Sequence, residues 1–210
     1  MDYRTLKKDG SSFLEEKRSK FLGDAFHVEN VSEAEDRLLS VAKKYHDARH
    51  HCYAWIVGKD SEFVKYADDG EPQGTAGQPI LELLKTAGLT DSIVIVTRYF
   101  GGILLGTGGL SRAYREAARK AIEDAGVLRK YEAEEIRADI DYALYGKIEN
   151  LFRTEELPKP EARFAGLVGI TLRIPSERTE EILRKITDLS QGRFSMTERK
   201  KVFLVGEENG

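Results

Sequence analysis

Glycines are concentrated in residues 98–114 (RYFGGILLGTGGLSRAY), between a segment typical of a strand and a segment typical of a helix. The first N–H groups of a helix lie at the positive end of its dipole, and glycines there let several amides approach one anion. Arginines on both sides of the glycines can add charge-assisted hydrogen bonds. The candidate anion-binding residues are Arg98, Gly101, Gly102, Gly106, Gly108, Gly109 and Arg112.

The same glycines also have a structural interpretation. Glycine adopts positive φ at little cost, which suits tight turns and close packing of a helix on a sheet. The spacing matches neither the GxxxxGK(S/T) pattern of P-loop proteins nor the GxGxxG pattern of dinucleotide-binding folds, so it gives little support to either class. An anion site and a packing device both stay open at the level of the sequence.

Residues 45–55 (YHDARHHCYAW) place three histidines next to the single cysteine of the chain. His46 and His50 have the spacing of two metal ligands on one helical face, which Cys52 or nearby acids could complete. Cys52 could also be a nucleophile paired with His50 or His51. The chain has no second cysteine and no HExxH pattern, and small buried cysteines are common in strands. We therefore expect neither a metal nor a cofactor, and His50 and Cys52 stay candidate site residues.

Acidic side chains are clustered in residues 68–79 (DDGEPQGTAGQP). Asp68, Asp69 and Glu71 could bind a hard cation or exchange protons. Asp-Gly and Glu-Pro are also strong turn signals, and a solvated turn is the simpler interpretation. The mixture of glycines and prolines would equally suit a loop that covers or binds a ligand.

Helices and strands must position these motifs. Residues 93–96 (IVIV) are apolar without interruption, which indicates a strand buried on both faces. Residues 31–45 repeat apolar side chains at helical spacing, and Ser32 with Glu35 forms a capping-box pattern. Over residues 1–130 we expect strands at 20–28, 52–57, 62–67 and 92–100 and helices at 31–45, 79–87 and 110–125.

A second unit is predicted after Gly126, where the pattern changes without a Pro-rich or Ser-rich linker. Apolar and polar residues alternate over residues 136–142, as expected for a strand with one solvated face. From this strand onward the order is strand, helix, strand, strand, helix, strand, which is the βαββαβ order of a ferredoxin-like domain. The predicted fold class is therefore α+β with two domains, residues 1–130 and residues 131–210.

The composition excludes several classes of protein. The net charge is −3 and neither half of the chain is basic, so any contact with RNA must be local. One cysteine cannot form an internal disulfide, and no segment has the ~18 apolar residues that span a bilayer. The N-terminal residues lack the apolar core of a signal peptide. We expect a cytoplasmic protein without membrane contact, and the oligomeric state stays open.

Three of these motifs occur together in a known family. The segments YHDARHHCYAW, DDGEPQGTAGQPIL and VTRYFGGILLGTGGLSRAY resemble the signature of the IMPACT family in its two-domain bacterial form, the YigZ type. The resemblance implies an N-terminal IMPACT domain similar to a fold of ribosomal proteins and translation factors, followed by a ferredoxin-like domain. It also implies a link to translation, because eukaryotic relatives bind a partner that activates a translational kinase.

Two main hypotheses about function follow. In the first, a non-enzymatic protein contacts RNA, the ribosome or a translation-related protein, with Arg98 and Arg112 holding a phosphate or an acidic group. In the second, an enzyme acts on a phosphorylated or nucleotide-like small molecule, and the loop acids and His50 border the glycine loop. A protein-interaction adaptor without a small ligand is a third alternative. The resemblance carries no catalytic residues over to this chain, and we favour the first hypothesis.

Overall fold

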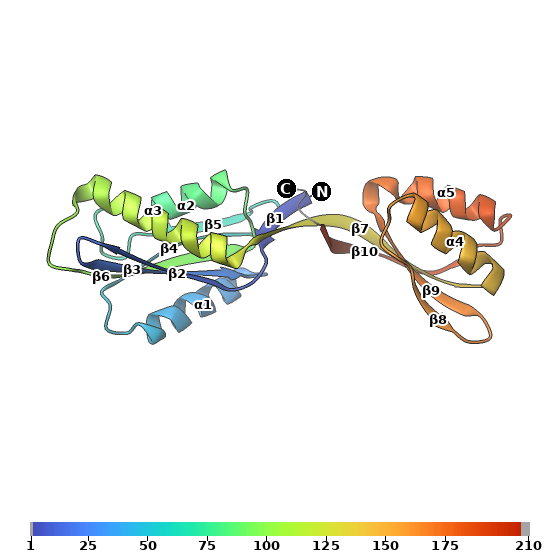
Figure 1. Ribbon diagram of the computed structural model, residues 1–210, viewed down its shortest axis with the longest axis horizontal. Helices are drawn as coiled ribbons and strands as arrows, with labels where there is room; N and C mark the ends of the chain where they lie inside the picture. Colours follow the sequence, from blue (N-terminus) through green and yellow to red (C-terminus); the bar gives the residue numbers. More distant parts are fainter. Residues whose placement is uncertain (1, 207–210) are drawn as a thin grey trace. The chain divides into compact units, whose positions relative to one another are not determined.

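The computed structural model describes residues 2–206, which form two compact units (Figure 1). The N-terminal unit comprises Tyr3–Arg129, and the C-terminal unit comprises Lys130–Gly206 together with Asp2. Each unit contains a β-sheet with helices packed on it. The predicted α+β class with two domains is therefore confirmed.

A five-stranded antiparallel sheet organises the N-terminal domain, in the order β2-β3-β6-β4-β5. Its strands are β2 (Gly10–Glu16), β3 (Ser19–His27), β4 (His50–Val57), β5 (Phe63–Ala67) and β6 (Ser92–Tyr99). β6 lies at the centre of the sheet and is buried along almost its whole length, as its apolar run predicts. Its C-terminal end leads directly into the glycine loop.

Helices cover both faces of this sheet (Figure 1). They are α2 (Gly77–Thr86) and α3 (Gly106–Ala125) on one face and α1 (Val31–Lys44) on the other. Gly23 of β3 lies beneath α3, where a Cβ atom would come within 2.8 Å of the Ala117 carbonyl oxygen. A Cβ atom on Gly10 would overlap the backbone of α3 at Ala121. Because these two strand positions lack side chains, α3 packs closely on β2 and β3.

The start of α1 differs from the capping pattern expected at Ser32 and Glu35. The N-cap residue is Asn30, whose Oδ1 accepts the Glu33 amide hydrogen at 2.9 Å. The Glu33 carboxylate in turn accepts the Glu29 amide hydrogen at 2.8 Å. Asn30 has the extended backbone typical of an N-cap. The capping residues are therefore Asn30 and Glu33, two positions before the predicted Ser32 and Glu35.

Other elements also differ from expectation, either in being unpredicted or in where they start. β1 (Asp2–Leu6) and β2 form where the sequence pattern predicts no element. The pattern misses them because charged and small polar side chains interrupt the alternation of polar and apolar residues that indicates a strand. α3 starts at Gly106 rather than at residue 110, so glycines make up its first turn. β7 (Val127–Ile140) begins well before residue 136, directly after the end of α3.

The C-terminal domain has the βαββαβ order of a ferredoxin-like fold, as predicted. Its remaining elements are α4 (Tyr142–Thr154), β8 (Glu161–Phe164), β9 (Val168–Pro175), the short 3₁₀-helix η1 (Ser176–Arg178), α5 (Thr179–Leu189) and β10 (Met196–Gly206). β7 pairs with β9 and β10, β9 pairs with β8, and β1 also neighbours β7. Apolar side chains of α4, α5 and the sheet, including Ile148 and Ile186, form a separate core.

Candidate functional site

Two of the three sequence motifs, the acidic loop and the glycine segment, meet at Glu71, and Cys52 of the third motif contacts the acidic loop. Glu71 comes from the loop between β5 and α2, Arg98 from the end of β6 and Tyr114 from α3. One carboxylate oxygen of Glu71 accepts hydrogen bonds from Arg98 Nη1 and from the Tyr114 hydroxyl, both at 2.7 Å. The side chains of Arg98 and Glu71 are only 6% and 4% exposed. The motifs therefore converge around a buried ion pair.

Arg98 is largely engaged in the interior of the domain. Its guanidinium carbon lies 5.5 Å from the ring centre of Phe21 and 5.4 Å from that of Phe100, and Nη2 is 3.4 Å from Ser19 Oγ. Within residues 2–206, its Nε atom has no hydrogen-bond partner. Because the Glu71 carboxylate balances its charge, Arg98 adds little to the long-range attraction of an anion.

Asp68 holds the start of α2. Its carboxylate accepts the amide hydrogens of Gly74, Ala76 and Gly77 at 2.8, 3.0 and 2.9 Å, respectively. This places a negative charge at the positive end of the helix dipole and supplies partners for amides that the helix itself leaves unpaired. The acidic loop is thereby fixed against α2.

Cys52 and Tyr114 are buried beside the ion pair. The Cys52 thiol donates to the Asp68 carbonyl oxygen at 2.9 Å, and burial is the main cause that raises its pKa. The pKa of the Tyr114 hydroxyl is also raised, mainly by burial. Both groups are therefore protonated at neutral pH, whereas a nucleophilic cysteine requires the thiolate.

The histidines of the motif lie in different elements of the fold. His46 lies in the turn after α1 and His50 in β4, so they do not share a helical face. His50 Nδ1 is 2.8 Å from the Asp69 carbonyl oxygen, and the Asp69 carboxylate accepts the His51 amide hydrogen at 2.6 Å. Burial lowers the pKa of His51, whose Nδ1 is 3.1 Å from Thr97 Oγ1. Among residues 2–206, no group of three or more His, Cys, Asp or Glu side chains could hold a metal ion.

The glycine loop divides into a packed part and an exposed part. The Gly101 amide donates to Ser19 Oγ at 3.1 Å, and a Cβ atom on Gly101 would overlap the backbone of Arg18. Gly102 and Gly106 have φ of 82° and 72° and open space where a side chain would be. Gly108 also lies on the exposed surface.

The start of α3 has no side-chain cap. Its N-cap residue is Leu105, which supplies no hydrogen-bonding side chain. The first turn contains the predicted Gly106, Gly108 and Gly109 and is followed by Arg112. The positive end of the α3 dipole is therefore open to an external acceptor.

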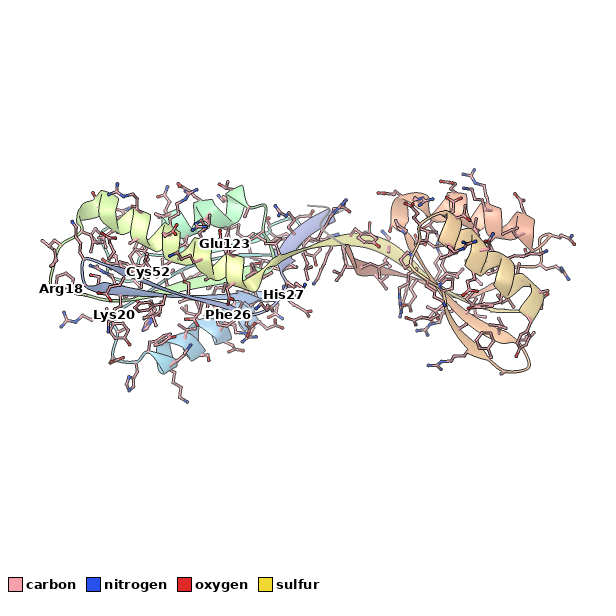
Figure 2. All side chains as sticks on the ribbon, in the orientation of Figure 1. Arg18, Lys20, Phe26, His27, Cys52 and Glu123 are labelled. Carbon is pink, nitrogen blue, oxygen red and sulfur yellow. The ribbon has the colours of Figure 1, made fainter. Side chains whose placement is uncertain are left out.

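Four exposed cations surround this helix start. We call Lys17, Arg18, Arg112 and Arg115 the α3-end surface, and none of them has an ion pair with another residue of the described chain. Lys17 and Arg112 line one pocket of 240 Å³, and Arg112 and Arg115 line a second one of 300 Å³. Figure 2 labels Arg18 at the β2–β3 turn, at the same end of the domain as the loop before α3 in Figure 1.

Acidic residues also line these two pockets. Glu16 and Glu116 line the first pocket and Glu82 the second, so the positive charge is partly offset. Glu116 already pairs with Arg119 and Lys120 on α3. The unpaired cations and the helix dipole still leave an excess of positive charge at this surface.

Lys17 and Arg18 are absent from the residues that the sequence motifs single out. They form the turn between β2 and β3, and Arg18 has a φ of 64°. Their only signal is a run of charged residues, EEKRSK, between two short apolar segments. Without the register of β2 on β3, this run does not indicate a position beside α3.

Fold and site together define a two-domain α+β protein, in which an antiparallel sheet carries the converged motifs and a ferredoxin-like domain follows. Comparison with protein families matches residues 17–122 to the Impact N-terminal domain and residues 139–193 to a domain of unknown function (DUF1949). The chain belongs to the IMPACT family, in its two-domain bacterial YigZ/YvyE type.

Individual relatives match nearly the whole chain. The chain is 33% identical over 202 residues to the IMPACT family member YvyE of Bacillus subtilis, which covers 96% of this chain and 93% of that protein. It is 34% identical over 182 residues to YigZ of Escherichia coli, covering 86% of this chain and 89% of that protein. A crystal structure described as a hypothetical protein matches 93% of this chain and 96% of its own, with 32% identity and a TM-score of 0.61.

None of the helices within residues 2–206 combines the length and apolar character needed to cross a membrane.

Proposed function

We propose that this chain is a translation-associated binding protein whose N-terminal domain contacts RNA phosphates through the α3-end surface. The observation that carries the proposal is that four exposed cations without ion pairs gather at a helix start without a side-chain cap. Phosphate oxygens accept hydrogen bonds from main-chain amides at helix starts and from arginine side chains. The link to translation rests on what membership of the IMPACT family implies.

The neighbouring aromatic and apolar side chains favour RNA as the partner. Phe100 is 55% exposed and directly precedes the glycine loop, and Leu104 within the loop is 82% exposed. Single-stranded RNA is commonly bound by cations that follow its backbone and aromatic rings on which bases stack. A local surface of this kind is compatible with a chain whose net charge is −3.

The buried ion pair supports this function indirectly. Glu71 joins the loop before α2 to the end of β6 and to α3, so these segments are fixed relative to one another. A preorganised surface loses less conformational entropy on binding than a mobile one. The use of Asp68 and Glu71 inside the fold favours a binding function over an enzyme that needs these carboxylates in a pocket.

The experiment compares three arginines of one helix. Arg112→Ala and Arg115→Ala remove unpaired cations, whereas Arg119→Ala removes an exposed cation that pairs with Glu116 and Glu123. We expect each of the first two variants to bind a fluorescent single-stranded RNA about fivefold more weakly, or ~1 kcal/mol. Each should also lower the slope of log K against log salt by about 0.7.

Arg119→Ala is the control variant, and a labelled acidic peptide is a second probe; each has an outcome that would contradict the proposal. Arg119→Ala should bind the same RNA within about twofold of the wild type, because this cation is already compensated. An equal loss of RNA affinity in all three variants would mean that binding depends on the total charge of the helix and not on the α3-end surface. Binding of a labelled acidic peptide without binding of RNA would instead assign the surface to a protein partner.

A further inference from the structure

β8 is the outer strand of the C-terminal sheet and, among residues 2–206, pairs only with β9 (Figure 1). The outer edge of such a strand carries main-chain amide and carbonyl groups to which another strand can hydrogen-bond. Pro160 directly precedes β8 and has no amide hydrogen, so the donors of this edge begin within β8 itself. The edge is therefore short, and it suits a strand of similar length.

The side chains of β8 alternate between the two faces of the sheet. Ala162 packs against the apolar core of the domain, and Phe164 lies against Tyr145 of α4, with ring centres 5.3 Å apart. Both therefore point to the face that the helices cover. Glu161 and Arg163 point to the opposite face, because neighbouring residues of a strand alternate.

These two charged residues make β8 complementary to a second copy of itself. When two identical strands pair about a two-fold axis, a residue that faces a second one is itself faced by the first in the other copy. With Ala162 opposite Ala162 of the second copy, each Glu161 faces an Arg163, and cross-strand pairs of opposite charge are favourable. Registers centred on Glu161 or on Arg163 place like charges opposite each other. Charge therefore selects one register.

Both charged groups are accessible for such pairs. Arg163 is exposed and has no ion pair with another residue of the described chain. The Glu161 side chain is 62% exposed and accepts from Arg173 Nη1 through Oε1, which leaves Oε2 for a second donor. A pair with Arg163 of the second copy can form without breaking the ion pair inside the domain.

The same register gives each Phe164 an apolar contact. Phe164 is 60% exposed, and in this register it lies opposite Pro160 of the second copy. Pro160 lines a pocket of 700 Å³ together with Leu157 of the same loop and Gly146 of α4, which has open space where a side chain would be. A phenylalanine ring fits within this volume. Because of the two-fold symmetry, the contact occurs twice.

We propose that the chain forms a two-fold symmetric dimer through antiparallel pairing of β8 with β8 of a second copy, with Ala162 at the symmetry axis. The interface is small, which is typical of complexes that form and dissociate reversibly. The proposal does not rest on RNA binding, because β8 belongs to the C-terminal domain and the α3-end surface to the N-terminal domain.

Sedimentation equilibrium of the full chain at increasing concentration measures this association. We expect the average mass to rise toward twice that of one chain. Glu161→Arg and Arg163→Glu should each weaken the dimer about tenfold or more, because each places like charges opposite each other at two symmetric positions. Circular dichroism checks that each variant is folded.

Exchange of the charges separates direct contact from a general loss of stability. The double variant Glu161→Arg with Arg163→Glu restores opposite charges across the axis and should dimerise within about threefold of the wild type. The two single variants, mixed in equal amounts, should associate with each other more tightly than either does with itself. In the mixed pair every charge at these positions faces an opposite one.

Phe164→Ala tests the apolar contact, and Arg184→Glu is the control. We expect Phe164→Ala to weaken the dimer about tenfold, because the ring is no longer buried against the second copy. Arg184→Glu reverses an exposed charge on α5 and should leave the association within about twofold of the wild type. If Glu161→Arg does not fold, the comparison of Arg163→Glu and Phe164→Ala with Arg184→Glu decides.

Three results would overturn the proposal. A wild-type chain that stays monomeric at the highest concentration would leave the β8 edge to a strand of a different protein. A dimer that both charge reversals leave intact would have its interface elsewhere. A dimer that Arg184→Glu weakens as much as Arg163→Glu would depend on the charge of the domain and not on β8.

Discussion

Glu71 and Arg98 belong to polar, glycine-containing motifs, yet their side chains are buried inside the domain. Both lie in glycine-containing segments that suggest contact with a ligand, yet they form a buried ion pair with Tyr114 as a third partner. Residue types and spacing can be read from the sequence. The pairing cannot, because it depends on which of several acids the fold brings to Arg98. Arg112, in contrast, is exposed and has no ion pair among the described residues, so anion binding by this residue stays a prediction.

Substitution of Glu71 should destabilise the protein, because Arg98 is buried and would lose its counter-charge. We expect Glu71→Ala to lower the free energy of unfolding by about 3–5 kcal/mol in urea, because it leaves a buried guanidinium without a counter-charge. The double variant Glu71→Ala with Arg98→Met should be more stable than Glu71→Ala alone. Glu16→Ala, at an exposed position, is the control and should have little effect. A loss below about 1 kcal/mol for Glu71→Ala would show that the pair is not a constraint on the fold.

At the scale of elements, the glycine loop contains a packed part and an exposed part, and anion binding by the exposed part stays a prediction. Gly101 allows the loop to pack on the β2–β3 turn, whereas Gly108 lies in the exposed first turn of α3. The sequence predicts the strand before the loop and the helix after it, because both have long apolar patterns. It does not predict that α3 begins at Gly106 or that residues 17 and 18 lie beside it, since glycine-rich starts and polar hairpins have weak local signals.

Alanine substitutions should separate the two kinds of glycine. Gly101→Ala is expected to destabilise the protein by about 1–3 kcal/mol, because the new methyl group overlaps the backbone of Arg18. Gly108→Ala should stabilise it by up to about 1 kcal/mol, because the position is helical and its Cβ would meet only Arg112 Nη1, at 3.9 Å.

Urea unfolding measures both changes, and RNA titration adds a second readout. Gly108→Ala keeps the backbone amide, so RNA binding should persist in this variant. If Gly101→Ala is as stable as the wild type, the loop does not need its close approach to the β2–β3 turn.

At the scale of the whole molecule, each domain has its own apolar core, and the order of elements in both can be largely predicted from the sequence. The strands missed at the N-terminus are those with the weakest alternation of polar and apolar side chains. Stability of the whole chain also depends on buried charges. One of these is Asp24 on β3, whose carboxylate is 8% exposed and lies 3.3 Å from Lys44 Nζ.

The stability of the chain should depend on pH through Asp24. Burial raises the pKa of Asp24 from 3.8, and the nearby Lys44 offsets this only in part. Folding therefore favours the protonated carboxyl, so this contribution to stability is present below pH 3.8 and is lost as pH rises through the raised pKa of the folded state. We expect Asp24→Asn to gain stability relative to the wild type between pH 4 and pH 7, measured by urea unfolding.

The control for this pH dependence is Asp36→Asn on the exposed surface of α1, which should show a flat difference from the wild type over the same range. A relative loss of stability in Asp24→Asn as pH rises would mean that the ion pair with Lys44 outweighs the cost of burial.

The most direct test of RNA binding at the α3-end surface is an NMR titration of the ¹⁵N-labelled chain with a short single-stranded RNA. The account predicts that the amide signals of residues 106–109 and the side-chain signals of Arg112 and Arg115 shift most, in proportion to bound RNA, and return as salt is raised. Shifts confined to the C-terminal domain, with the signals at the start of α3 unchanged at saturation, would contradict it.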